Sequence, residues 1–189
     1  MWKILRQIAR TGIRTEPAPQ EGDAVRVAAE RIQREILDVL GQALAIRQVD
    51  AGSCNGCELE IHALNNPYYN IEGLGIRFVA SPRHADMLLV TGPVSRNMEV
   101  ALRRTYDATP DPKLVVAVGD CGRDGGIFGQ SYASCGGVSN VIPVDVAVPG
   151  CPPAPIEILY GILAAVHRTR SSPATVGAAD DEENIRDER

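Results

Sequence analysis

The chain has 189 residues, of which 44% are hydrophobic, and its formal net charge at pH 7 is -5. This size and hydrophobic content suit one globular domain, no apolar run approaches the roughly 20 residues that span a bilayer, and no secretory signal is recognisable. Residues 180–189 carry six acidic and two basic side chains, so the rest of the chain is nearly neutral and we expect no nucleic-acid partner.

The first 14 residues form a basic segment that contains no acidic side chain. Apolar residues are interleaved there with Lys3, Arg6, Arg10 and Arg14, which predicts a short amphipathic helix. Because so short a helix is marginal in water, we expect it to order against a partner subunit or an anionic lipid surface; a frayed terminus is the alternative. Two prolines and a glycine between residues 15 and 22 indicate a linker, so residues 1–22 are expected to precede the folded domain.

Residues 23–170 have the pattern of one α/β domain. Short apolar segments alternate with segments of helical periodicity, which predicts a parallel sheet with helices on both faces. We expect strands at 44–49, 76–80, 87–91, 114–118 and 141–148, and helices at 23–40, 97–108 and 155–167, with a short helix after the cysteine turn at 52–58. Residues 171–189 are rich in Ser, Ala and acidic residues, and we expect this acidic tail to be disordered.

Four of the five cysteines follow predicted strands. Cys54 and Cys57 form a Cys-x-x-Cys pair after the first strand, and Gly56 between them allows a tight turn. Cys121 and Cys151 each lie just past the carboxyl end of a later strand. Because the carboxyl ends of parallel strands share one edge of a sheet, where ligands bind, we predict that these four sulfur atoms meet at one site.

The cysteine pattern is compatible with three kinds of site. A thioredoxin-like dithiol at Cys54 and Cys57 leaves the other two cysteines unexplained. Structural zinc also takes four thiolates but is usually held by two closely spaced pairs, whereas Cys121 and Cys151 are single. One pair and two single cysteines suit a 4Fe-4S cluster, which is held by four thiolates. We expect the remaining cysteine, Cys135, to be a buried free thiol.

Several stretches resemble the small iron-sulfur subunit of membrane-bound, energy-converting nickel-iron hydrogenases, a family similar in turn to the 20 kDa subunit of respiratory complex I. They are Gly-Ser-Cys-Asn-Gly-Cys-Glu at 52–58, the segment 81–94, Val-Gly-Asp-Cys at 118–121 and the segment 143–153. The resemblance extends over about residues 40–168. It implies a flavodoxin-like fold without flavin, electron transfer as the activity, and a 4Fe-4S cluster with Cys54, Cys57, Cys121 and Cys151 as its ligands.

The resemblance also implies partners and a location. The cluster is expected to pass electrons between a ferredoxin-like iron-sulfur subunit and a nickel-iron large subunit, in a complex with integral membrane subunits on the cytoplasmic side of the inner membrane. Complex I subunits of this type carry two adjacent cysteines in the first motif, whereas two residues separate Cys54 from Cys57, as in the hydrogenase and formate hydrogenlyase branch. The alternatives are a quinone-reducing complex I relative beside a 49 kDa-type subunit, and a zinc-stabilised binding module.

Two further features bear on the site. Glu58 directly follows the second cysteine, and the resemblance implies that it transfers protons; an acid stabilised by the dipole of the short helix is the alternative. Between Cys121 and the last strand, about twenty glycine-rich residues show no periodicity. Loops of this length inside a domain are usually functional or disordered, and we expect glycines here to bring main-chain amides close to a cluster.

Overall fold

The computed structural model describes residues 2–11, 34 and 43–171. The predicted helix at 23–40 and the predicted disordered tail therefore lie essentially outside the described residues. The helices are α1 (Trp2–Thr11), α3 (Gly56–Ala63), α4 (Arg96–Ala108), α5 (Gly119–Asp124) and α6 (Pro155–Ser171), with short 3-10 turns η1 (Ile71–Leu74), η2 (Pro82–His84) and η3 (Val138–Asn140). The strands are β1 (Leu44–Asp50), β2 (Ile76–Phe78), β3 (Met87–Thr91), β4 (Leu114–Val118) and β5 (Val146–Val148).

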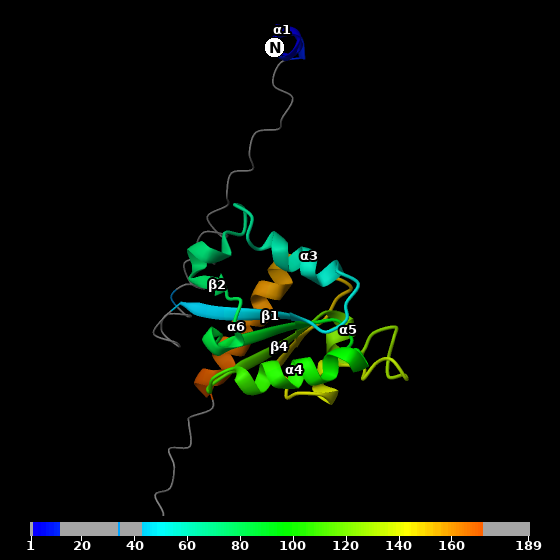
Figure 1. Ribbon diagram of the computed structural model, residues 1–189. Coiled ribbons are helices and arrows are strands. Elements are labelled where there is room, and N and C mark those ends of the chain that lie inside the picture. Colours follow the sequence, from blue (N-terminus) through cyan, green and yellow to red (C-terminus); the bar gives the residue numbers. More distant parts are fainter. Residues whose placement is uncertain (1, 12–33, 35–42, 172–189) are drawn as a thin grey trace, which may run out of the picture.

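The five strands form one sheet in the order β2-β1-β3-β4-β5. Figure 1 shows this sheet in the middle of the domain, between helices. Every neighbouring pair in this sheet is parallel. This is the strand order of flavodoxin-like folds, in which ligands bind at the carboxyl ends of the strands. The predicted α/β class and flavodoxin-like topology are therefore confirmed.

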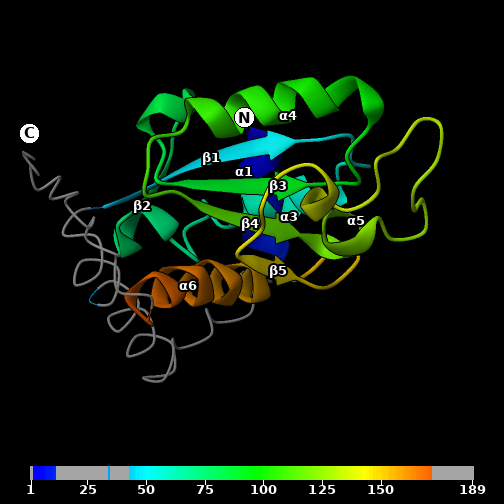
Figure 2. The same cartoon turned by 90° about the horizontal axis from the view of Figure 1, so that it is seen from below.

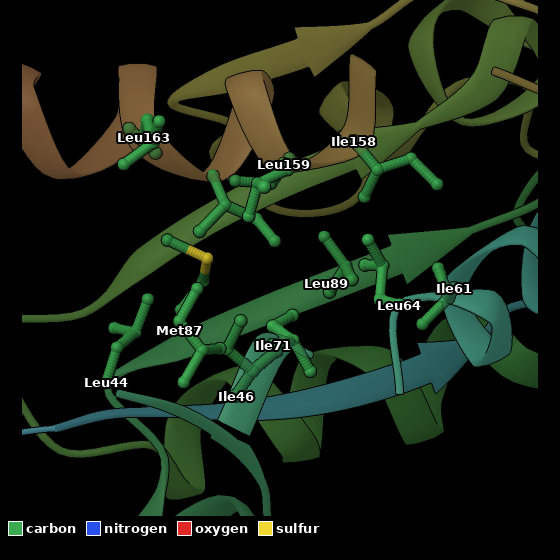
Figure 3. Packing of buried hydrophobic residues seen from close by; sticks show 14 of the residues in the cluster. Leu44, Ile46, Ile61, Leu64, Ile71, Met87, Leu89, Ile158, Leu159 and Leu163 are labelled. Atoms are coloured by element: carbon green, nitrogen blue, oxygen red, sulfur yellow. The ribbon is translucent and has the colours of Figure 1, made fainter. Parts of the chain in front are cut away.

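Both faces of the sheet are buried, because alternate residues of the central strands point to opposite sides. In β3, Met87 and Leu89 pack on one face, while Leu88 and Val90 pack on the other. The first face is covered by α3, η1 and α6, and Figure 3 shows Ile61, Leu64, Ile71, Ile158, Leu159 and Leu163 packed over it. The second face is covered by α4 and by the segment around η3, and Figure 2 shows α4 and α6 on opposite sides of the sheet. Helices on both faces hold the strand ends in fixed positions.

The last strand is shorter than expected. The apolar run 141–148 predicts a strand throughout, but β5 covers only Val146–Val148. Pro143 cannot donate a ladder hydrogen bond, and Val141 and Ile142 are instead buried under the second face of the sheet. Asp145 then joins the run to β4, because its carboxylate accepts from the Val115 amide at 2.8 Å and its own amide donates to the Val115 carbonyl at 2.9 Å.

Candidate metal centre

A small cavity lies beyond the carboxyl ends of four strands. It has a volume of about 110 Å³, and its lining comes from the segments that follow β1, β3, β4 and β5. The lining residues are Ser53, Cys54, Gly56, Cys57, Gly92, Asp120, Cys121, Gly150, Cys151 and Pro152. The four predicted cysteines therefore do meet at one site, as the sheet topology led us to expect.

The first two cysteines are presented by a turn that Asp50, the last residue of β1, holds in place. One oxygen of its carboxylate accepts from the amides of Gly52 and Ser53, each at 2.9 Å. Asn55 then adopts a left-handed conformation with φ 73°, a region that asparagine tolerates better than most residues. The helix α3 begins at the next residue, so Cys54 lies on the turn and Cys57 in the first helical turn.

Two glycines let other parts of the chain approach this turn closely. Gly92, after β3, has φ 77°, and a Cβ there would lie 2.6 Å from the Ser53 nitrogen. Gly119, after β4, has φ 82°, and a Cβ there would lie 2.7 Å from the Cys57 Sγ. Side chains at these positions would fill the space beside the cysteines, and L residues rarely adopt such φ values.

A reciprocal pair of hydrogen bonds joins the loops that carry the two single cysteines. The Asp120 amide donates to the Gly150 carbonyl at 2.8 Å, and the Gly150 amide donates to the Asp120 carboxylate at 3.1 Å. Cys121 and Cys151 directly follow these two residues, so the pair fixes one sulfur-bearing segment against the other. Sequence reasoning missed this role of Asp120; its position directly before Cys121 in the Val-Gly-Asp-Cys motif is the signal that could have found it.

The cysteines differ in exposure and influence one another electrostatically. Cys57 is buried, Cys121 is partly buried, and Cys54 and Cys151 are exposed. Burial raises the pKa of the Cys57 thiol to about 12, with smaller contributions from Glu58 and from the other three cysteines. Burial also raises the pKa of Cys121, and the nearby Cys151 and Cys54 raise it further by smaller amounts. Four thiolates so close together would repel one another unless a cation lay between them.

The donor set of four cysteines fits an iron-sulfur cluster, which is held by thiolates. None of the described residues that line the cavity is basic, so the chain itself supplies no positive charge at its wall. Within the described part of the chain, no three His, Cys, Asp or Glu side chains converge on a point where one metal ion could be held. Zinc needs its thiolates about 2.3 Å from one centre, whereas a 4Fe-4S cluster takes each thiolate at a different iron. That the four cysteines are ligands stays a prediction.

Cys135 lies away from this cavity. Its buried thiol donates to the Glu99 carboxylate on α4 at 3.4 Å, and Arg96 and Arg103 bind the same carboxylate. Backbone hydrogen bonds in both directions between Val94 and the Cys135–Gly136 segment fix the end of the glycine-rich loop to the segment between β3 and α4. The prediction of a buried free thiol is confirmed, and the thiol has a structural partner.

The glycine-rich loop touches the site only at its start. Gly126 has φ 52°, and a Cβ there would lie 3.0 Å from the Cys121 Sγ. Farther along, the loop projects from the domain as the yellow-green segment after α5 in Figures 1 and 2, and the side chains of Ile127 and Tyr132 are 93% and 98% exposed. Gly126 is therefore a loop glycine whose backbone lies beside the Cys121 sulfur.

Glu58 is a buried carboxyl group beside the cavity. Its side chain is 4% exposed, and neither carboxylate oxygen has a hydrogen-bond partner among the described residues. Glu58 lies in the first turn of α3, where the helix dipole favours a negative charge. A buried polar group without a hydrogen-bond partner is costly, which makes Glu58 a candidate functional residue.

The comparisons with known proteins agree on one family. Residues 54–165 match the family model described as NADH ubiquinone oxidoreductase, 20 kDa subunit. The chain is 44% identical to formate hydrogenlyase subunit 7 of Escherichia coli over 71% of its own length, although the match spans only 53% of that relative. It is 42% identical to the probable membrane-bound hydrogenase subunit mbhJ of Pyrococcus furiosus, over 74% of this chain and 85% of the relative.

A solved structure has the same fold. The membrane-bound sulfane sulfur reductase, an archaeal respiratory membrane complex, contains a chain that is 33% identical to this one, with a TM-score of 0.62. The similarity covers 73% of this chain and 77% of that one. Among the helices that the structure describes here, none has the length and apolar character to cross a membrane.

Proposed function

Because the chain belongs to the NADH ubiquinone oxidoreductase 20 kDa subunit family, a family of oxidoreductase-complex subunits, we propose that it is an electron-transfer subunit with one 4Fe-4S cluster. The observation that carries this proposal is the convergence of Cys54, Cys57, Cys121 and Cys151 on one cavity at the carboxyl edge of the sheet. These four residues would hold the cluster, which supplies reversible uptake of one electron at a time. The rest of the chain would position the four cysteines, limit the access of water to the cluster and set the charge around it.

The uneven exposure of the ligands supports a position between other subunits. Cys57 and the adjacent Glu58 are buried, whereas Cys54 and Cys151 are open to solvent. The helices that follow the cysteines, α3 and α6, pack against each other and carry exposed apolar side chains at Leu59, Ile156 and Tyr160. A partner subunit that covered this side would shield the cluster from water, and exposure is one determinant of a cluster's reduction potential.

The experiment that tests the cluster is analysis of the anaerobically purified chain. We expect about four iron and four acid-labile sulfide atoms per chain and, after reduction, an electron paramagnetic resonance signal of a 4Fe-4S cluster. Zinc in place of iron, without sulfide, would contradict the proposal and would support the zinc-stabilised binding module instead.

We further propose that the complex is a membrane-associated hydrogenase rather than a quinone reductase. The two-residue spacing of Cys54 and Cys57 and the similarity to a formate hydrogenlyase subunit and a probable membrane-bound hydrogenase subunit support this branch. The partners would then be a nickel-iron large subunit, a ferredoxin-like iron-sulfur subunit and integral membrane subunits, with this chain peripheral on the cytoplasmic side. The sequence of the large subunit that co-purifies with this chain would distinguish the two. Two Cys-x-x-Cys pairs in it would indicate a nickel-iron site, and their absence would favour the quinone-reducing, complex I-type alternative.

Glu58 is proposed to transfer protons between the cluster region and the large subunit. Glu58→Gln keeps the size of the side chain but cannot release a proton at neutral pH, so we expect hydrogen production by the assembled complex to fall at least roughly 100-fold. The cluster signal should persist. Glu60→Gln on the same helix is the matched control and should leave the rate unchanged. An unchanged rate in Glu58→Gln would leave a purely structural role for this carboxyl group.

A further inference from the structure

The helix α1 separates basic and apolar residues almost completely. Lys3, Arg6 and Arg10 are three and four residues apart, so they occupy one side of the helix. At the helical spacing of the sequence, Ile4, Leu5 and Ile8 occupy positions on the opposite side. No acidic residue occurs in the helix, so the basic side has no internal counter-charge.

The described side chains of α1 are exposed. Lys3, Arg6 and Arg10 are exposed to solvent, and the indole of Trp2 is 80% exposed. On the helix, Trp2 falls at the border between the apolar and the basic side. An indole at such a border is characteristic of helices that lie at a membrane-water interface, because its apolar ring and polar N–H suit that boundary.

We propose that α1 binds the surface of an anionic lipid bilayer, with its apolar side in the interface and its basic side toward the lipid headgroups. Charge complementarity favours this partner: three cations without an acid match a surface of phosphate groups, each basic residue adding to the affinity. Because ten residues make a marginal helix in water, contact with the bilayer would also stabilise the helix itself. The proposal does not depend on the cluster or on the hydrogenase assignment.

Trp2 makes this inference directly testable, because it is the only tryptophan in the chain. The full-length chain is mixed with vesicles of phosphatidylglycerol and phosphatidylcholine in equal parts, or of phosphatidylcholine alone. With the anionic vesicles we expect Trp2 emission to shift to shorter wavelength and to be quenched by brominated lipids. With phosphatidylcholine alone we expect much weaker binding.

Charge substitutions complete the test. The triple variant Lys3→Gln, Arg6→Gln, Arg10→Gln keeps good helix formers and should partition onto the anionic vesicles about 100-fold less strongly. The matched control, Arg77→Gln, Arg83→Gln, Arg104→Gln, removes the same charge from exposed positions of the α/β domain and should bind like the parent chain.

Four results would overturn the proposal: unchanged Trp2 emission with anionic vesicles, equal binding to neutral vesicles, equal loss in the control variant, or emission already at short wavelength in buffer. The last result would indicate that α1 is buried against protein, either a second copy or its own domain. Iron and sulfide analysis of the same samples reports on the proposed cluster separately, so the two proposals can fail independently.

Discussion

Replacing Cys151 with serine is expected to remove the proposed cluster while leaving the domain folded. Cys151 is exposed and lies outside both hydrophobic clusters of the core, so its substitution costs little packing. It is, however, one of four sulfur donors around the cavity, and a serine hydroxyl is a poor ligand for iron at neutral pH. We expect iron and sulfide to fall at least roughly tenfold and the reduced-state paramagnetic signal to disappear.

Cys135→Ser is the matched control for this experiment. Cys135 is also a free cysteine, but its thiol donates to Glu99 rather than to the cavity, and a serine hydroxyl can donate to the same carboxylate. This variant should retain the full iron content and the signal. Loss of iron in Cys135→Ser with retention in Cys151→Ser would show that the ligand set is wrong.

Gly119→Ala is expected to impair cluster binding through sterics rather than through loss of a ligand. At φ 82° the alanine would be strained by about 1–2 kcal/mol. Its Cβ would also lie 2.7 Å from the Cys57 Sγ and 3.3 Å from the Gly150 carbonyl oxygen. Relief requires Cys57 or the Gly150 loop to move, so we expect lower iron occupancy in addition to a free energy of unfolding reduced by about 3 kcal/mol.

Gly75→Ala separates the effect of backbone strain from the effect of close contact with the site. Gly75 has φ 80°, almost the same as Gly119, but a Cβ there would meet nothing within 4 Å. This control should lower the free energy of unfolding by the backbone strain alone, about 1–2 kcal/mol, and keep the full iron content. Chemical denaturation with iron analysis on both variants measures the difference. Equal iron content in the two would mean that close approach at Gly119 does not matter for the site.

The topology of this domain could be predicted from its sequence because the signals were local and redundant. β3 and β4 are uninterrupted apolar runs, and their bounds, 87–91 and 114–118, agree with the predicted ones. The meeting of the cysteines followed from topology alone, since each comes just after a strand of one parallel sheet. The apolar run 141–148 led to the prediction of a strand that is too long. Apolar residues indicate burial rather than a particular backbone conformation, and here an irregular segment is buried as well as a strand.

Other parts of the site were not predictable, because they depend on contacts between distant loops. The hydrogen bonds between Asp120 and Gly150 join positions 30 residues apart, and no periodicity encodes them. The lack of a partner for Glu58 likewise appears only once the surrounding atoms are placed. The same holds for the Cys135–Glu99 contact, which links residues 36 positions apart.

The hydrogen bonds between Asp120 and Gly150 also bear on the order of events during biosynthesis. A nascent chain that has emerged from the ribosome only as far as α5 already carries three of the four sulfur donors, but it lacks Gly150, Cys151 and the strand β5 that positions them. Domains generally fold as units during synthesis. Under the proposed function, maturation of the metallocentre therefore follows translation of nearly the whole domain, and a prematurely terminated product cannot sequester a complete cofactor.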